Sequence, residues 1–245
     1  MAMCEHDRCS EMAFDDSNWC ILHLDFPNED NPDFTRIKDE KQLKTKEKIE
    51  QGDLDFEGTN IYTVDASDIS IPAQNDAIFR NAIIRGRVTF ERTKIGKSAL
   101  FEGAKIEKNA SFAGAEIGAE ARFEGAEIGG DATFAGAEIR GATQFKRVKI
   151  RGYATFAGAI IRGDVRFEGA EIGGDAWFEG AQIGEDAWFR GAQIAGDVRF
   201  EKAEITGDAR FEEASVTGDI RFAGAQIGEE ACFEGAEIGG TVNLD

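Results

Sequence analysis

Residues 110–134 read ASFAGAEIGAEARFEGAEIGGDATF, and the spacing of large apolar residues in this stretch decides the fold. Phe112 and Phe123 are eleven residues apart, and Ile117 and Ile128 each follow a phenylalanine by five residues. Large apolar residues that return at a fixed interval indicate that the chain repeats one structural unit many times.

The same interval extends outward through most of the chain. A phenylalanine returns every eleven residues from Phe79 to Phe233, and the residue five positions later is isoleucine in every repeat except one, where it is Val216. A unit this short can bury its apolar side only against neighbouring units. The interval therefore predicts a solenoid over residues 77–244.

Each large apolar residue closes a triplet that starts with a small residue, as in Ala110-Ser111-Phe112 and Ala115-Glu116-Ile117. Such a triplet points two alternate side chains inward and the middle one outward, which is strand periodicity. These triplets resemble the pentapeptide-repeat proteins, whose five-residue unit has a small residue and then a leucine or phenylalanine two positions later. The resemblance implies an all-β solenoid, a right-handed quadrilateral β-helix with four faces per coil. This sequence has one extra residue in every second unit, so we expect coils of about 22 residues instead of about 20.

In a coil of this length, residues 22 positions apart stack. Phe112 should then lie over Phe134, while Phe101 and Phe123 belong to a second ladder on the opposite side and isoleucines fill the other two sides. At about 4.8 Å per coil, the chain would form a rod of about 40 Å with a dry, packed interior. Two other architectures remain open at this point, a triangular helix with about 33 residues per coil and a flattened two-sided one.

Composition agrees with a soluble β-rich chain. The 245 residues include 29 glycines and only 3 prolines, without a low-complexity linker. No apolar run approaches the ~20 residues of a membrane-spanning helix, and residues 1–8 are charged and have no apolar signal region. We expect a cytoplasmic protein that does not enter a membrane.

The first segment contains a set of metal-ligand residues. Cys4, Cys9, Cys20 and His23 follow the spacing C-x4-C-x10-C-x2-H. Thiolate and imidazole are ligands that zinc prefers, and four protein ligands make a structural site because no position is left for water. We predict a zinc site at these residues. The alternatives are His6 as the fourth ligand, a disulfide, and cysteines that are simply buried.

A helix is expected between this segment and the repeats. Residues Asp33–Gln51 contain no glycine or proline, follow Asn-Pro and are followed by a glycine, which are start and stop signals of a helix. We therefore expect a zinc-binding knuckle at 1–30, a capping helix at 31–52 that covers the open edge of the first coil, and the β-helix at 53–245. The first coil, at 54–71, keeps unmodified five-residue steps.

Charge is distributed unevenly along the chain, whose net charge is −19. Residues 1–76 carry a net −12, residues 77–163 a net +6 and residues 164–245 a net −13. The acidic part has an aspartate at each extra corner position: Asp164, Asp175, Asp186, Asp197, Asp208 and Asp219. Stacked aspartates repel one another unless cations or arginines offset their charge.

These charges admit several functions. The first is a non-enzymatic scaffold for protein interaction, whose charges keep a repetitive rod soluble. The alternative is a DNA-mimicking regulator or protector of a DNA-binding enzyme such as a topoisomerase, a role that members of the resembled family perform. Calcium binding at the aspartate corners and direct binding of nucleic acid by the basic middle are weaker hypotheses. An enzyme is not expected, because both histidines lie in the metal segment and a packed interior has no pocket.

Outward aromatic residues and the arginines of the basic middle are candidate contacts for a partner protein: Trp177, Trp188, Arg140, Arg147, Arg151 and Arg162. Stacking by 22 residues places Trp188 between Arg166 and Arg210, where ring and guanidinium can also simply stabilise the ladder. The last coil exposes an unpaired strand edge, so we also expect a homodimer through the C-terminal coils.

Overall fold

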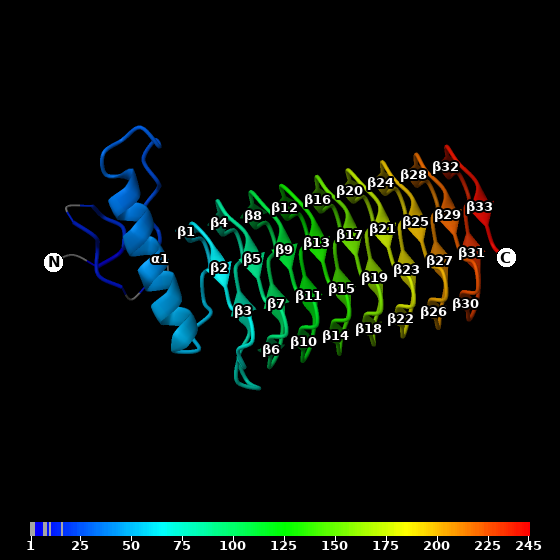
Figure 1. The fold of residues 1–245 in the computed structure, drawn as a ribbon, viewed down its shortest axis with the longest axis horizontal. Helices are drawn as coiled ribbons and strands as arrows, with labels where there is room; N and C mark the ends of the chain where they lie inside the picture. Colours follow the sequence, from blue (N-terminus) through cyan, green and yellow to red (C-terminus); the bar gives the residue numbers. More distant parts are fainter. Residues whose placement is uncertain (1–2, 7–8, 10, 16) are drawn as a thin grey trace.

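The chain forms a rod of stacked coils with a helix across one end (Figure 1). The computed structural model describes residues 3–6, 9, 11–15 and 17–245. Within these residues there are one helix, α1 (Phe34–Glu50), and 33 strands of two residues each. Every strand pairs in parallel with strands of the neighbouring coils, and the pairs build four sheets.

The four sheets are numbered here in the order in which the chain first visits them. Sheet 1 consists of β1 (Asn60–Ile61), β4 (Ile83–Ile84), β8 (Lys105–Ile106), β12 (Glu127–Ile128), β16 (Lys149–Ile150), β20 (Glu171–Ile172), β24 (Gln193–Ile194), β28 (Ser215–Val216) and β32 (Glu237–Ile238). Sheet 2 consists of β2 (Val64–Asp65), β5 (Val88–Thr89), β9 (Ala110–Ser111), β13 (Ala132–Thr133), β17 (Ala154–Thr155), β21 (Ala176–Trp177), β25 (Val198–Arg199), β29 (Ile220–Arg221) and β33 (Val242–Asn243). Sheet 3, which starts one coil later, consists of β6 (Lys94–Ile95), β10 (Glu116–Ile117), β14 (Glu138–Ile139), β18 (Ile160–Ile161), β22 (Gln182–Ile183), β26 (Glu204–Ile205) and β30 (Gln226–Ile227). Sheet 4 consists of β3 (Ala77–Ile78), β7 (Ala99–Leu100), β11 (Ala121–Arg122), β15 (Thr143–Gln144), β19 (Val165–Arg166), β23 (Ala187–Trp188), β27 (Ala209–Arg210) and β31 (Ala231–Cys232).

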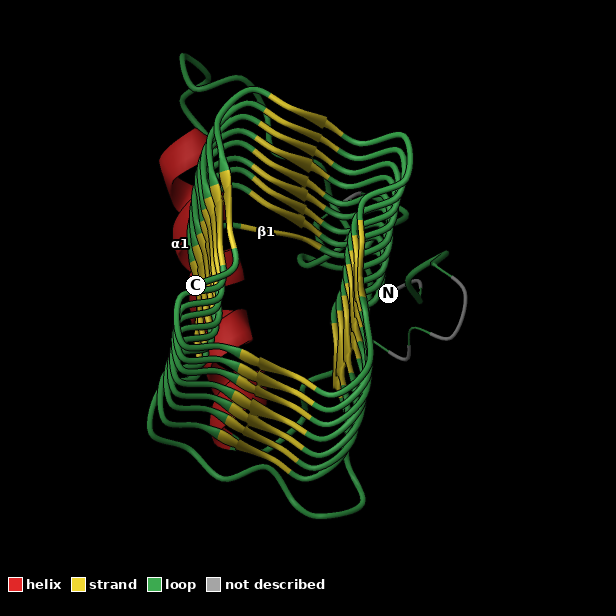
Figure 2. Cartoon of the chain, turned by 90° about the vertical axis from the view of Figure 1, so that its right-hand side faces the viewer, coloured by secondary structure: helices red, strands yellow, loops and turns green. Residues whose placement is uncertain are grey.

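Seen along the rod, the four sheets are the four sides of a tube (Figure 2). In the regular part of the tube, paired residues are 22 positions apart, as in Ile128↔Ile150 and Ala132↔Ala154. Sheets of seven to nine strands give about eight coils. The predicted parallel β-solenoid with four faces and about 22 residues per coil is therefore confirmed, and the triangular and two-sided alternatives are wrong.

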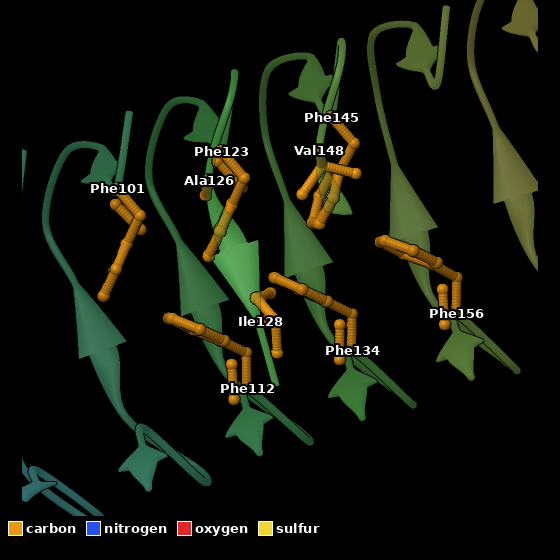
Figure 3. Close-up of a cluster of buried hydrophobic side chains, with 14 of the residues drawn as sticks. Phe101, Phe112, Phe123, Ala126, Ile128, Phe134, Phe145, Val148 and Phe156 are labelled. Carbon is orange, nitrogen blue, oxygen red and sulfur yellow. The ribbon is translucent and has the colours of Figure 1, made fainter. Parts of the chain in front are cut away.

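Two phenylalanine ladders fill the interior (Figure 3). The rings of Phe112 and Phe134 stack with centroids 4.8 Å apart and an interplanar angle of 2°. Phe123, from the opposite ladder, meets Phe112 edge to face at 5.6 Å and 89°. All three side chains have no exposed surface. The two ladders thus interlock across the axis, as offset and edge-to-face aromatic pairs prefer, and leave a dry core.

The corners of the tube are of two kinds. After each phenylalanine the chain makes a tight turn that needs a residue with positive φ, as at Gly125 with φ 65°. After each isoleucine it makes a wider bend, which contains the extra residue. Gly129 lies in such a bend, where an added Cβ would come within 2.3 Å of the Glu107 carbonyl oxygen of the preceding coil.

Helix α1 lies across the first coil, beside β1 and β2 (Figure 1). Its buried residues are Ile37, Lys41, Thr45 and Ile49, which recur every four positions and so share one face. The first coil is closed by four buried side chains at five-residue steps, Phe56, Ile61, Ala66 and Ile71. Among the described residues, no helix is long and apolar enough to cross a membrane.

Candidate metal centre and surface sites

The four predicted metal ligands lie together beside the first coil. Their donor atoms, the thiol sulfurs of Cys4, Cys9 and Cys20 and one ring nitrogen of His23, are all within 4.8 Å of one another. A tight turn brings two of them close, because the backbone N–H of His23 donates to the Cys20 carbonyl at 3.1 Å. The other two come from an earlier loop, in which Cys4 and Cys9 are five residues apart.

The separations fit a tetrahedral zinc ion. Zinc bound at about 2.3 Å by sulfur and about 2.0 Å by nitrogen requires S···S distances of about 3.8 Å and S···N distances of about 3.5 Å. Cys9 Sγ lies 3.7 Å from Cys20 Sγ, and Cys4 Sγ lies 3.6 Å from His23 Nδ1. Cys20 Sγ is closer to His23 Nδ1, at 3.1 Å, so this one edge would widen when an ion binds. The donor set and its spacing suit zinc.

The first coil orients the histidine. His23 Nε2 lies 3.2 Å from the Glu57 carbonyl oxygen, so an Nε2–H that donates there leaves Nδ1 as the ligand atom. On the other side of the ring, His6 stacks on His23 with centroids 3.9 Å apart. His6 also fills the space next to Gly58, where a Cβ would come within 2.4 Å of its Nε2. The ligand cluster is therefore attached to the solenoid through Glu57 and Gly58.

Without a metal, the three thiols differ in acidity. Burial raises the pKa of Cys9 to about 12 and also raises the pKa of Cys20. Burial acts in the same direction on Cys4, but hydrogen bonds from the backbone of Cys20 and His6 outweigh it and lower the pKa of Cys4 to about 7. Binding of zinc would replace the protons on all three sulfurs.

A buried lysine joins α1 to the same region. Lys41 has no exposed surface, and its Nζ donates to the carbonyl oxygens of Leu24 and Asn60, each at 2.5 Å. Asn60 begins β1, so one of these acceptors belongs to the open edge of the first coil. Burial lowers the pKa of Lys41 to about 7. The lysine supplies donors to carbonyls that have no preceding coil to pair with.

Trp188 lies in a ladder with two arginines on sheet 4. It is partly buried between its register partners Arg166 and Arg210, whose guanidinium carbons are 5.6 Å and 4.4 Å from the ring centroid. Both distances fit cation–π contacts. The predicted neighbours are confirmed, and the contacts stabilise the ladder whether or not a partner binds there.

Trp177 lies in a similar ladder on sheet 2. It pairs in register with Thr155 and Arg199, as predicted, and the Arg199 guanidinium is 5.7 Å from its ring centroid. The ring also stacks on Tyr153 at 5.0 Å, and its Nε1 donates to Asp175 at 3.0 Å. This indole is thus held on all sides by its own chain.

The four arginines predicted as partner contacts are spread over three corners of the tube. Arg147 lies between sheets 4 and 1, Arg151 between sheets 1 and 2, and Arg140 and Arg162 between sheets 3 and 4. All four are exposed. None of them forms an ion pair with a residue that the structure describes.

The neighbouring lysines behave differently. Lys149 pairs with Glu171 of the next coil at 2.9 Å, and Lys146 pairs with Glu168 at 3.2 Å. Both lysines are members of the same basic middle, so position in the rod does not explain the difference. The structure therefore separates charges that satisfy one another from the four arginines, which are available to a ligand.

The stacked aspartates are held by their own chain. Asp186 Oδ1 accepts the backbone N–H of Asp208 at 2.8 Å, and the same contact recurs between Asp197 and Asp219 at 3.0 Å. The second oxygen commonly meets an arginine two residues later, as Asp219 does with Arg221 at 2.8 Å. That arginine is the main cause of the lowered pKa of Asp219, about 2. Arginines and backbone N–H groups thus offset the repulsion, in place of calcium.

The hollows on the rod lie on its outer surface. One of about 520 Å³ follows sheet 1 and is lined by outward residues that include Lys149, Arg151 and Gln193. A second, also about 520 Å³, continues along the same sheet from Ile83 to Arg151. Their lining contains no nucleophile with a base beside it.

Two features were missed at the sequence level. Lys41 was treated as one charge of a polar helix, although the four-residue interval from Ile37 to Ile49 passes through it and would have predicted its burial. The gap in the series of corner aspartates at Ala142 was also not noticed, because only the positions that carry an acid were considered.

Comparison with known families gives one match. The family described as pentapeptide repeats (9 copies) matches residues 90–138, 123–171, 156–204 and 200–245, which overlap and together extend from residue 90 to the last residue. No curated protein matches the chain. No solved structure matches it either.

Proposed function

The chain belongs to the pentapeptide-repeat family, and on this premise we propose that it is a non-enzymatic scaffold that binds a protein partner through the outer surface of the tube. The observation that carries the proposal is the contrast between a completely packed interior and four exposed arginines without ion pairs. A phenylalanine core leaves no room for a ligand inside. Arginine is frequent among the residues that dominate binding at protein interfaces.

One of the four arginines is placed at a conformational cost. Arg147 has φ 54°, at a turn position where Gly125 and Gly169 serve in the adjacent coils. A non-glycine residue in this region costs on the order of 1 kcal/mol, which supports a role for the side chain at the surface.

The test replaces the four arginines by glutamine and measures capture of the partner from the source cells, followed by reconstitution with the purified partner. The arginine variant should keep its β-sheet circular dichroism and lose the partner. The matched control replaces Lys146 and Lys149, whose charges are already paired. Equal loss in both variants would show that binding follows net charge and not the proposed surface.

We further propose that Cys4, Cys9, Cys20 and His23 hold one structural zinc ion. In this organisation residues 1–30 are the zinc-binding segment, residues 31–52 the capping helix and residues 53–245 the solenoid. The four donors would leave no open position, so the ion would supply folding free energy and no catalysis.

Elemental analysis of the purified chain tests the metal. We expect one zinc per chain, and its loss in Cys20→Ser. Cys232→Ser is the control, because Cys232 lies on sheet 4 near the other end of the rod. Zinc retained in Cys20→Ser, or zinc lost in Cys232→Ser, would contradict the assignment.

A homodimer through the C-terminal coils is supported by the apolar surface there. Val242 and Leu244 are 40% and 62% exposed, and Phe233 is only partly buried, whereas the phenylalanines before it are buried. Sedimentation equilibrium should show a dimer that Val242→Glu disrupts. A monomer at micromolar concentration would exclude it.

The alternative, a DNA-mimicking regulator of a topoisomerase or similar enzyme, is less well supported. The corner aspartates that form the regular acidic series are engaged with arginines and backbone N–H groups, so they do not present free charges at phosphate-like intervals. Inhibition of gyrase supercoiling by stoichiometric protein would favour this alternative over the scaffold.

A further inference from the structure

The corner between sheets 3 and 4 contains a ladder of side-chain acceptors. At this corner the backbone N–H of one coil donates to a side chain located 22 residues earlier. Asp208 donates to Asp186 at 2.8 Å, and Asp186 donates to Asp164 at 3.1 Å. Near the N-terminal end Ser98 donates in the same way to Asp76 at 2.9 Å. Each acceptor satisfies an N–H that the wide bend removes from the sheet hydrogen bonds.

The ladder is interrupted in the middle of the rod. Ala142 has no side-chain acceptor for the N–H of Asp164, and Glu120, which should serve Ala142, is bonded to Arg122 instead. Neither the Ala142 nor the Asp164 N–H has an acceptor among the residues that the structure describes. Two donors that every other coil from Ser98 onward satisfies are therefore open here.

Two unpaired arginines stand at the same interruption. Arg140 and Arg162 are 22 residues apart in this bend, so they lie one above the other, about 4.8 Å apart along the rod. The equivalent positions in the coils before and after are Gly118 and Gly184, which present no side chain. Glu138, on the adjacent strand, forms no ion pair with either arginine in the described part of the chain.

Stacked arginines repel each other unless an anion lies between or over them. The guanidinium groups and the two open N–H groups together supply many donors and no acceptor, which is the composition of a carboxylate-binding site. We propose that this interruption is a docking notch for an acidic segment of the partner protein, with a carboxylate of the partner in the place of the missing ladder acid. The notch consists of Arg140, Ala142, Arg162 and Asp164. The inference rests on the proposed scaffold function and names the chemistry of the partner.

The surroundings favour a short acidic protein segment over nucleic acid. The notch lies within residues 77–163, which carry a net +6, but acidic regions of −12 and −13 flank them and would repel a long polyanion. Ile160, on β18 beside the notch, is 37% exposed and offers an apolar contact that a peptide side chain can use. An acidic residue followed by an apolar one fits both features.

The test measures binding of a fluorescent peptide that contains glutamate and leucine, by anisotropy, to the full chain. Ala142→Asp supplies the missing acceptor from within the chain and fills the notch. It should weaken binding about tenfold or more, which corresponds to loss of one charge-assisted hydrogen bond. Lys149→Gln, which removes an already paired charge from sheet 1, is the matched control and should bind as the unmodified chain does.

Unchanged affinity in Ala142→Asp would overturn the proposal, as would no binding to the unmodified chain. A single-stranded oligonucleotide of equal charge is tested alongside, and tighter binding of the oligonucleotide than of the peptide would also overturn it. If Ala142→Asp does not fold, the pair Arg140→Gln and Arg162→Gln is used, and the same loss of affinity is expected. Failure here together with partner capture that depends on Arg147 and Arg151 would refute the notch but leave the scaffold function intact.

Discussion

The N-terminal region, residues 3–76, and the repeat tube, residues 77–245, are stabilised in different ways. In the tube every contact recurs: each phenylalanine stacks on the next, as Phe134 does on Phe112, and each sheet pair has the same register. In the N-terminal region the main contacts occur once. The ligand cluster at Cys20 and the buried Lys41 have no equivalent elsewhere among the described residues.

This difference implies different responses to damage. A solenoid gains stability from the sum of similar neighbour contacts, so loss of one is shared by the coils around it. A region that depends on a single cluster has no second copy of the contact. The predictions below use perturbations that should separate the two regions, in order of decreasing effect.

Removal of zinc should have the largest effect, and only in the N-terminal region. Structural zinc contributes on the order of 10 kcal/mol to the folding of small zinc domains. After chelation, hydrogen exchange should become fast in residues 3–50 and stay slow in the coils beyond residue 99. Rapid exchange throughout the tube would show that the two regions fold as one unit.

Phe134→Ala should have the next largest effect, in the tube. The ring stacks on Phe112 and Phe156 and meets Phe123 edge to face, so truncation leaves a cavity and should cost about 3–5 kcal/mol. Equilibrium unfolding in denaturant measures the change. Phe134→Leu, which keeps most of the volume, should cost much less, and an equal loss in both variants would mean that aromatic stacking and not volume holds the ladder.

The sequence predicted the tube because the tube is periodic. Once Phe112 and Phe134 are placed in register, the direction of every side chain in the repeats follows from strand alternation. The ligand residues were also identified from spacing, since thiols and imidazole are rare and their chemistry is specific. Both predictions depend on patterns that a single sequence displays.

The remaining features depend on contacts between distant segments. That Lys41 reaches the carbonyl oxygens of Leu24 and Asn60, and that Glu57 orients His23, follows from how the first 50 residues lie on the first coil. No periodicity encodes that placement. The open donors at Ala142 required the hydrogen bonds of the neighbouring coils to be known.

Lys41 predicts a pH dependence of the N-terminal region. Burial lowers its pKa from 10.5 to about 7, so between these values the unfolded chain binds more protons than the folded one. The free energy of unfolding should therefore rise with pH from about 7 to 10.5, by at most about 1.4 kcal/mol per pH unit, and the full cost of the buried charge remains below pH 7.

The measurement compares zinc-saturated protein with Lys41→Met by hydrogen exchange of the first coil as a function of pH. The variant should lose the slope, although it leaves the carbonyls of Leu24 and Asn60 without a donor. The comparison is needed because thiols titrate in part of the same range. An identical slope in the variant would assign the pH dependence to other groups.

The corner ladder should give the smallest effect and the sharpest contrast with the metal cluster. Asp186→Ala removes the acceptor of the Asp208 N–H and should cost about 1 kcal/mol, confined to adjacent coils, since one hydrogen bond among many similar ones is lost. Asp186→Asn keeps an acceptor oxygen and should cost less, as denaturant unfolding of the two variants would show. If asparagine were as costly as alanine, the ladder would act through the charge pairing of Asp186 with Arg210, at 4.0 Å, and not through the N–H bond. The open N–H groups at Ala142 would then be less important to the notch than its two arginines.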